Sequence, residues 1–179
     1  MRCRKLLKRF LPSEYVKSIY HIKAEDLKAK GIKGIITDLD NTLVEWDRPN
    51  ATPKLINWLE ELKLNDIKVT IVSNNNEQRV RIFSDPLRIP FIHKARKPLG
   101  RAFRKAIKLM GTTKEETVII GDQLLTDVLG GNRAGFYTIL VIPVAKSDGF
   151  FTRFNRKIER GIMANFKRKG LIDWEDEQQ

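Results

Sequence analysis

Three carboxylates, a hydroxyl group and a lysine occupy positions in this sequence from which they could act together on a phosphate ester. Asp38 and Asp40 end the apolar run IITDLD, Ser73 lies near the end of KVTIVSN, and Asp122 ends TVIIGD. Carboxylates held close together raise one another's pKa unless a cation neutralises them, and clustered oxygen ligands suit Mg²⁺. Lys97, near the start of a predicted helix, could add a positive charge. The spacing alone leaves two interpretations open, Mg²⁺-assisted phosphoryl chemistry and an ordinary core with polar turns.

The segments that carry these residues alternate between strand and helix patterns. Apolar, β-branched runs predict strands at 35–40, 68–74, 91–92, 117–122 and 137–142. Apolar side chains at helical spacing predict helices from Pro53 onward, over 77–84, over 99–110 and from 124 to the glycines that follow. Such alternation implies right-handed crossovers and a parallel sheet covered on both faces. We therefore predict an α/β fold, a Rossmann-like three-layer sandwich with a mainly parallel central sheet whose strand ends gather the polar residues.

These residues, in this order, resemble the four motifs of the haloacid dehalogenase (HAD) superfamily. DLDNT at 38–42 is similar to the first motif, DxDxT, and Ser73 in VTIVSNN matches the second. Lys97 in RKPLG matches the third, and VIIGDQLLTD, which contains Asp122 and Asp127, matches the fourth. The resemblance covers roughly residues 34–142 and implies a HAD-like fold. The stretch GDQLLTDVLGGNRAG is especially similar to the type IIIA phosphatases.

The resemblance implies a role for each motif residue. Asp38 would be the nucleophile that forms an aspartyl-phosphate, and Asp40 would be the general acid and base. Mg²⁺ would be held by the carboxylates of Asp38 and Asp122 and by the backbone carbonyl of Asp40. Four residues would bind the phosphate oxygens or neutralise their charge: Thr42, Ser73, Asn74 and Lys97. Asp127 would orient Lys97 or a metal-bound water, unless it is simply a carboxylate on the side of a helix.

Many members of this superfamily carry a cap domain over the site, but the gaps between the motifs here are short. About 30 residues separate Thr42 from Ser73, and a predicted helix uses many of them. Only 23 residues lie between Ser73 and Lys97. We therefore expect no cap domain, and an uncapped site would stay open to bulky substrates such as proteins, nucleic acids or lipid headgroups.

The chain has 34 basic and 22 acidic residues, a net charge of +12 that is unevenly distributed. Residues 1–33, predicted as a basic helical segment, hold ten Lys or Arg and three acids, whereas the predicted catalytic core at 34–145 holds sixteen and thirteen. Residues 146–170 hold eight basic and two acidic residues, and 171–179 form an acidic tail. Basic flanks indicate a polyanionic partner, either nucleic acid or an anionic membrane surface, although solubility alone could also explain them.

The segment 146–179 contains a predicted basic amphipathic helix. Its apolar residues share one arc at helical spacing: Phe151, Phe154, Ile158, Ile162 and Phe166. Its basic residues fall on the opposite side: Arg153, Arg156, Lys157, Arg160 and Lys167. Such a helix can lie in a membrane interface, or it can pack its apolar face on the domain, and the sequence leaves both open. No apolar stretch reaches the ~20 residues that a membrane span requires.

The whole chain looks like a bacterial group of type IIIA phosphatases that is similar to the phosphatidylglycerophosphate phosphatases of mitochondria and plastids. This resemblance implies a Mg²⁺-dependent enzyme that removes the terminal phosphate of an anionic phospholipid. We accordingly expect a cytoplasmic protein, peripheral on the inner face of the cell membrane. Two alternatives remain open: a phosphatase for nucleic-acid ends or phosphoproteins, and a non-catalytic protein that binds RNA or a ribosome-assembly partner.

Overall fold

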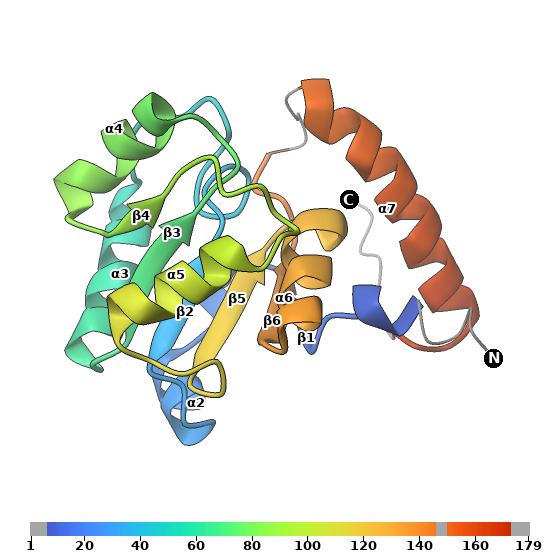
Figure 1. Cartoon of the computed structure of the whole chain (residues 1–179), viewed down its shortest axis with the longest axis horizontal. Helices are drawn as coiled ribbons and strands as arrows, with labels where there is room; N and C mark the ends of the chain where they lie inside the picture. The colour runs from blue at the N-terminus through green and yellow to red at the C-terminus, as the bar shows by residue number, and fades with distance from the viewer. Residues whose placement is uncertain (1–6, 146–149, 173–179) are drawn as a thin grey trace.

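The computed structural model describes residues 7–145 and 150–172, with the side chains of 150–154 left out of the description. Within these residues six strands form one sheet in the order β1-β6-β5-β2-β3-β4 (Figure 1). The strands are β1 (Glu14–Val16), β2 (Gly34–Thr37), β3 (Lys68–Val72), β4 (Phe91–Ile92), β5 (Thr117–Gly121) and β6 (Tyr137–Val141). Every pairing between neighbours is parallel. The predicted α/β fold with a parallel central sheet is confirmed.

Helices connect the strands and cover both faces of the sheet. They are α2 (Ala24–Ala29), α3 (Pro53–Leu64), α4 (Glu77–Leu87), α5 (Arg101–Met110), α6 (Leu129–Ala134) and α7 (Phe150–Arg168). Shorter turns are η1 (Lys8–Phe10), η2 (Ile19–His21) and the π-helical turn η3 (Leu124–Val128). The segment predicted as one helix from residue 124 is therefore divided, with its first turn wound more widely than the α6 turns that follow.

Local sequence explains where the helices begin and end. The hydroxyl of Thr52 accepts a hydrogen bond from the amide of Leu55 at 3.2 Å, and Pro53 occupies the first turn of α3. The side chain of Asn76 caps α4 in the same way. Helix α5 ends at Gly111, whose φ of 66° is a left-handed conformation that glycine adopts without a steric penalty.

Two apolar layers separate the sheet from its helices. On one face α2, α3 and α4 contribute the buried side chains of Leu27, Leu55, Trp58, Leu62, Val80 and Phe83. On the other face α5 packs against the sheet through Phe103, Ala106 and Met110, next to Phe136. Helices α5 and α6 lie on the side opposite α3 and α4 in Figure 1. The molecule is thus the predicted three-layer sandwich.

No cap domain is evident in the described part of the chain, as predicted. The connection from β2 to β3 contains α3, and the connection from β3 to β4 contains α4. The loop 93–100 and helix α5 connect β4 towards β5. Among the described residues, none of the helices combines the length and the apolar character needed to cross a bilayer.

The segment 1–33, predicted to be helical, also contributes a strand to the sheet. Strand β1 pairs with β6, where Tyr15 is in register with Leu140, and the amide of Ser13 donates to the carbonyl of Thr138 at 2.9 Å. Strand β1 was not predicted, because three residues are too few for an alternating pattern to be recognised.

Helix α7 packs on the core through part of the predicted apolar face. Phe166 is fully buried, and Ile162 and Met163 pack against a cluster formed by Leu124, Val128 and Leu140. Ile158, predicted to share the buried face, is 42% exposed. Arg156, expected on the solvent side, turns toward the core. The helix is therefore rotated about its axis relative to the predicted orientation. The side chains of Phe151 and Phe154, and residues 173–179 of the predicted acidic tail, lie outside the described residues.

Candidate active site

The candidate site lies at the carboxyl edge of the parallel sheet. Asp38 directly follows β2, Ser73 follows β3 and Asp122 follows β5. The strand ends are aligned, since Thr37 is in register with both Ile71 and Ile120. Adjacent strands that end level with one another bring their following residues to one place, which is where open α/β sheets bind ligands.

Three buried carboxylates meet at this edge. One oxygen from each of Asp38, Asp122 and Asp127 lies within 4.8 Å of the others. The ammonium group of Lys97 lies 2.9 Å from an oxygen of Asp38 and 2.7 Å from an oxygen of Asp127. Because these groups are almost completely buried, solvent does little to screen their interactions. Lys97 of the third motif therefore contacts Asp38 of the first motif and Asp127 of the fourth.

The loop before α5 positions Lys97 through its backbone. The side-chain oxygen of Asn74 accepts a hydrogen bond from the amide of Lys97 at 2.7 Å, and the Asn74 nitrogen donates to the Lys97 carbonyl at 3.3 Å. Ser73 beside it is buried, and its hydroxyl oxygen accepts from the amide of Asn75 at 3.1 Å. The turn after β3 thus holds both the serine hydroxyl and the lysine.

Gly121 explains how Asp127 reaches the site. A Cβ atom at position 121 would collide with the carboxylate of Asp127, so only glycine leaves the space that this side chain occupies. The second oxygen of Asp127 accepts from the amide of Gln123 at 3.2 Å. The glycine of the GD motif therefore positions an acid six residues further along the chain.

The chain turns after Asp38, so the carboxylate of Asp40 has different partners from that of Asp38. Asn41 has a φ of 62°, a left-handed conformation that asparagine tolerates better than most residues, and it reverses the chain. The carboxylate of Asp40 accepts from Asn75 Nδ2 at 3.0 Å and from Arg79 Nε at 3.0 Å. Burial raises the pKa of Asp40, although the hydrogen bond from Asn75 opposes the shift. A carboxyl group with a raised pKa retains its proton nearer to neutral pH.

Asp122 is held by a residue from a distant helix. Thr42 donates to its carboxylate at 2.7 Å, and Arg156 of α7 donates to its carbonyl at 2.5 Å and pairs with its carboxylate. Arg156 also lies 3.3 Å from an oxygen of Glu159, and the other oxygen of Glu159 accepts from the amide of Leu125 at 2.9 Å. Helix α7 is therefore attached to the candidate site by two polar side chains.

Burial dominates the electrostatics of the cluster. It raises the pKa of Asp122 to about 7, with Arg156 acting in the opposite direction. It raises the pKa of Asp127 to about 6, where Lys97 opposes the change. Burial would lower the pKa of Lys97, but the neighbouring carboxylates Asp127 and Asp38 together raise it above its ordinary value. Lys97 thus remains charged, while the carboxylates are only partly compensated.

The chemistry of this cluster fits a divalent cation. Three carboxylates face two cationic side chains, Lys97 and Arg156, and burial, together with the charges of Asp38 and Asp127, raises the pKa of Asp122 in spite of Arg156. Oxygen ligands of this kind suit a hard cation such as Mg²⁺. The buried carboxylates of Asp38, Asp122 and Asp127 are close enough together to hold a metal ion, because one oxygen of each lies within 4.8 Å of the others.

Three residues of the site were not predicted: Asn75, Arg79 and Arg156. The first two hold Asp40, and Arg79 stands in the first turn of α4, where no motif marks it. Arg156 belongs to a basic face whose orientation depends on how α7 docks. The sequence gives little indication of such contacts, because the partner residues are far apart in the chain.

Comparisons with known proteins agree with this geometry. A profile described as HAD-hydrolase-like matches residues 94–143. The chain is 68% identical over 171 residues to the "Probable phosphatase YqeG" of Bacillus subtilis, covering 96% of this chain and 99% of that protein. It is 32% identical to phosphatidylglycerophosphate phosphatase 1 of Arabidopsis thaliana, covering 90% of this chain but 49% of the plant protein.

A solved structure gives a similar fold at lower sequence identity. The cobalt-bound deoxy-D-mannose-octulosonate 8-phosphate phosphatase of Haemophilus influenzae superposes with a TM-score of 0.54, covering 82% of this chain and 96% of the other at 20% identity. The family match and the 68% identity to the Bacillus subtilis protein show that the chain belongs to the HAD-like hydrolase family. Its similarity to these two relatives identifies it more narrowly as one of the HAD-type phosphatases.

Proposed function

We propose that this protein is a Mg²⁺-dependent phosphomonoester hydrolase that acts through an aspartyl-phosphate on Asp38. The observation that carries the proposal is the buried grouping of Asp38 with Asp122, Asp127 and Lys97, in which the lysine is 2.9 Å from Asp38. A carboxylate at the end of a rigid strand, beside a fixed positive charge, is suited to in-line attack on phosphorus.

In the first half of the reaction, an oxygen of Asp38 forms a bond to phosphorus as the bond from phosphorus to the leaving oxygen breaks. Asp40 gives its proton to that leaving oxygen, and its raised pKa supports this role. In the second half, Asp40 takes a proton from water, whose oxygen attacks phosphorus. The bond from phosphorus to Asp38 then breaks, which releases inorganic phosphate and restores the carboxylate.

The remaining motif residues bind and orient the phosphate. We assign the phosphate oxygens to Thr42, Ser73, Asn74 and Lys97. Asp127 keeps Lys97 in place through the 2.7 Å contact. The carboxylates of Asp38 and Asp122 and the backbone carbonyl of Asp40 would hold Mg²⁺, which supplies a positive charge that stabilises the transferring phosphoryl group.

We propose phosphatidylglycerophosphate as the substrate, a phosphomonoester on an anionic phospholipid. Three observations support it: the similarity to the Arabidopsis enzyme over 90% of this chain, the uncapped site and the net charge of +12. An uncapped site on a basic protein can approach a phosphate on a large anionic surface. The protein would then act at the cytoplasmic face of the cell membrane.

A phosphate-release assay with Mg²⁺ tests this assignment. Phosphatidylglycerophosphate in mixed micelles should be hydrolysed faster than sugar phosphates, nucleotides, RNA with phosphorylated ends or phosphopeptides. Faster release from one of the soluble substrates would reject the lipid and identify the alternative. No release from any of them, with RNA bound tightly, would favour a non-catalytic binding protein.

The nucleophile is tested by Asp38→Asn, which removes the attacking carboxylate oxygen. Phosphate release should fall at least about a thousand-fold, and a chelator should have a similar effect on the wild type. Asp40→Asn is the informative companion, because its backbone carbonyl is unchanged and only proton transfer is lost. If purified Asp38→Asn protein retained most of the activity, another group would have to be the nucleophile.

A further inference from the structure

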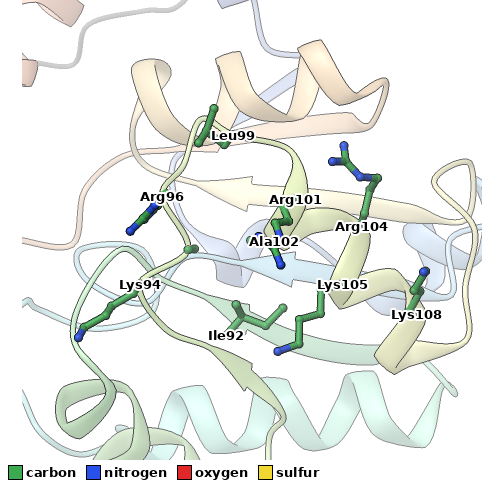
Figure 2. A pocket seen from close by; sticks show the side chains of 10 residues that line it. Ile92, Lys94, Arg96, Leu99, Arg101, Ala102, Arg104, Lys105 and Lys108 are labelled. Atoms are coloured by element: carbon green, nitrogen blue, oxygen red, sulfur yellow. The ribbon is translucent and has the colours of Figure 1, made fainter.

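A groove with basic walls lies beside the loop that carries Lys97. It has a volume of about 790 Å³, and ten residues line it, none of them acidic. Figure 2 shows the loop with Lys94, Arg96 and Leu99 on one side and α5 with its basic side chains on the other. The basic residues of the lining are Lys94, Arg96, Arg101, Arg104, Lys105 and Lys108.

These six side chains are exposed, and their charges are not neutralised locally. Within the described residues no ion pair joins any of them to a carboxylate, whereas other exposed cations are paired, as Arg81 is with Glu77 and Lys33 with Glu116. Lys94 acts on Glu77 only through space, as a minor contribution to the lowered pKa of that carboxyl group. Six like charges around one hollow create a positive potential that attracts a polyanion.

The loop side of the groove has a fixed shape. Lys94 and Arg96 have φ values of 44° and 56°, left-handed conformations that residues with a Cβ rarely adopt. Two backbone hydrogen bonds hold the loop to the end of β3, from the amide of Lys94 to Asn75 at 2.9 Å and from that of Ala95 to Ser73 at 3.0 Å. A partner in the groove would therefore lie against the same rigid loop that presents Lys97 to the carboxylates.

The composition of the groove favours a lipid surface over nucleic acid. No aromatic residue lines it, so it offers no platform on which bases could stack. Leu99 is 56% exposed among the cations, and an apolar side chain surrounded by positive charge suits the boundary between headgroups and acyl chains. The other predicted membrane surface, the apolar face of α7, is partly used for packing because Phe166 is fully buried.

We propose that this groove and Leu99 seat the protein on a bilayer rich in anionic phospholipid, with the headgroups against the six basic side chains. The proposal rests on the proposed function, because it identifies the surface on which a lipid phosphate would be presented. It gives a role to Lys94 and Arg96 on the loop that also carries Lys97, and to the four basic residues of α5, because a bilayer in contact with the groove has its headgroups beside the active-site edge.

Vesicle co-sedimentation of charge-reversal variants tests the proposal. The groove variant is Arg104→Glu with Lys105→Glu, and the matched control is Lys28→Glu with Lys63→Glu, whose exposed side chains lie on helices of the opposite face. Both change the net charge equally, and circular dichroism checks that both are folded. On vesicles of equal parts phosphatidylglycerol and phosphatidylcholine, the groove variant should bind about 30-fold more weakly than the wild type or worse. The control should stay close to the wild type.

Two results would overturn the proposal. Equal losses in the groove variant and the control would mean that net charge, and not the groove, governs binding. A wild type that binds these vesicles no better than pure phosphatidylcholine, but binds RNA through the groove residues, would make nucleic acid the partner. The proposed substrate is judged separately by the wild type's phosphate release in micelles, so either idea can fail while the other stands.

Discussion

Lys97 and Arg96 are neighbours in the chain, yet they represent two opposite uses of positive charge. Lys97 is 7% exposed and contacts two carboxylates at 2.9 and 2.7 Å. Arg96 is exposed on the rim of the basic groove. A buried charge must be paired because desolvation is costly, so its effect is local and depends on precise geometry. An exposed charge acts over about 10 Å at ordinary ionic strength, so it can attract a large surface.

The loop 94–100 therefore carries a buried charge that acts at short range and exposed charges that act at longer range. Because its backbone is anchored by Asn74 and Asn75, alternate side chains are held toward the core and toward solvent. The difference predicts that substitutions at 97 will alter stability and chemistry. Substitutions at 96 should alter association while leaving the fold intact.

Lys97→Met should produce the largest loss of stability. It leaves Asp38 and Asp127 buried without their cation, which should lower the free energy of unfolding by about 3–5 kcal/mol in denaturant titrations. Arg96→Met is the matched control and should change it by less than about 0.5 kcal/mol. Adding Asp127→Asn to Lys97→Met should restore part of the loss. Equal, small effects at both positions would contradict the contrast between them.

Arg156→Met should have a smaller effect that depends on metal. In a chelator the variant should lose about 2 kcal/mol, less than a fully buried pair because the Arg156 side chain is 16% exposed. Mg²⁺ should then raise the unfolding temperature of the variant more than that of the wild type, since the ion compensates Asp122 in place of the guanidinium. Identical Mg²⁺ shifts in the two proteins would argue against a metal at this carboxylate.

Raising the salt concentration should distinguish the exposed charges from the buried ones, and it requires the smallest change to the protein. The Debye length falls from about 10 Å at 0.1 M to about 3 Å at 1 M, so vesicle binding should weaken by at least about tenfold over that range. The destabilisation caused by Lys97→Met should change little, because its ion pairs are shielded from solvent. A salt-dependent loss at Lys97, measured in parallel denaturant titrations, would mean that water reaches the pairs.

Much of the site could be predicted because its motif residues stand directly after strands. Asp38 and Asp122 follow β2 and β5 within one residue, so the parallel topology alone brings them together. The contacts of Arg79 and Arg156 could not be predicted, because they depend on the rotation of α4 and α7 against the sheet. The net charge of the segment 34–145 does not indicate the basic groove, because acidic residues elsewhere in the segment offset its charge. Residues 94–108 contain seven basic residues and no acidic one.

The fold could be predicted from local sequence in the same way. The prediction failed where an element depends on a partner that is distant in the chain. Long β-branched runs identified β3, β5 and β6, but Gly130 and Gly131, expected to break the helix after residue 124, lie inside α6, which ends at Gly135. The three-residue strand β1 has no pattern of its own and exists because β6 offers an open edge. Structure that depends on a distant partner leaves little trace in local sequence.

The pairing of β1 with β6 has a consequence for how the chain is made. Strand β1 leaves the ribosome before the other described strands and must wait for a partner about 125 residues later, as the bond between Ser13 and Thr138 illustrates. Until β6 is synthesised, β1 has no sheet to join, and β5 remains an unprotected edge. The central strands can assemble earlier, but closure of the sheet is a late, long-range event that slows folding. The growing chain would therefore be most exposed to aggregation just before residues 137–141 appear.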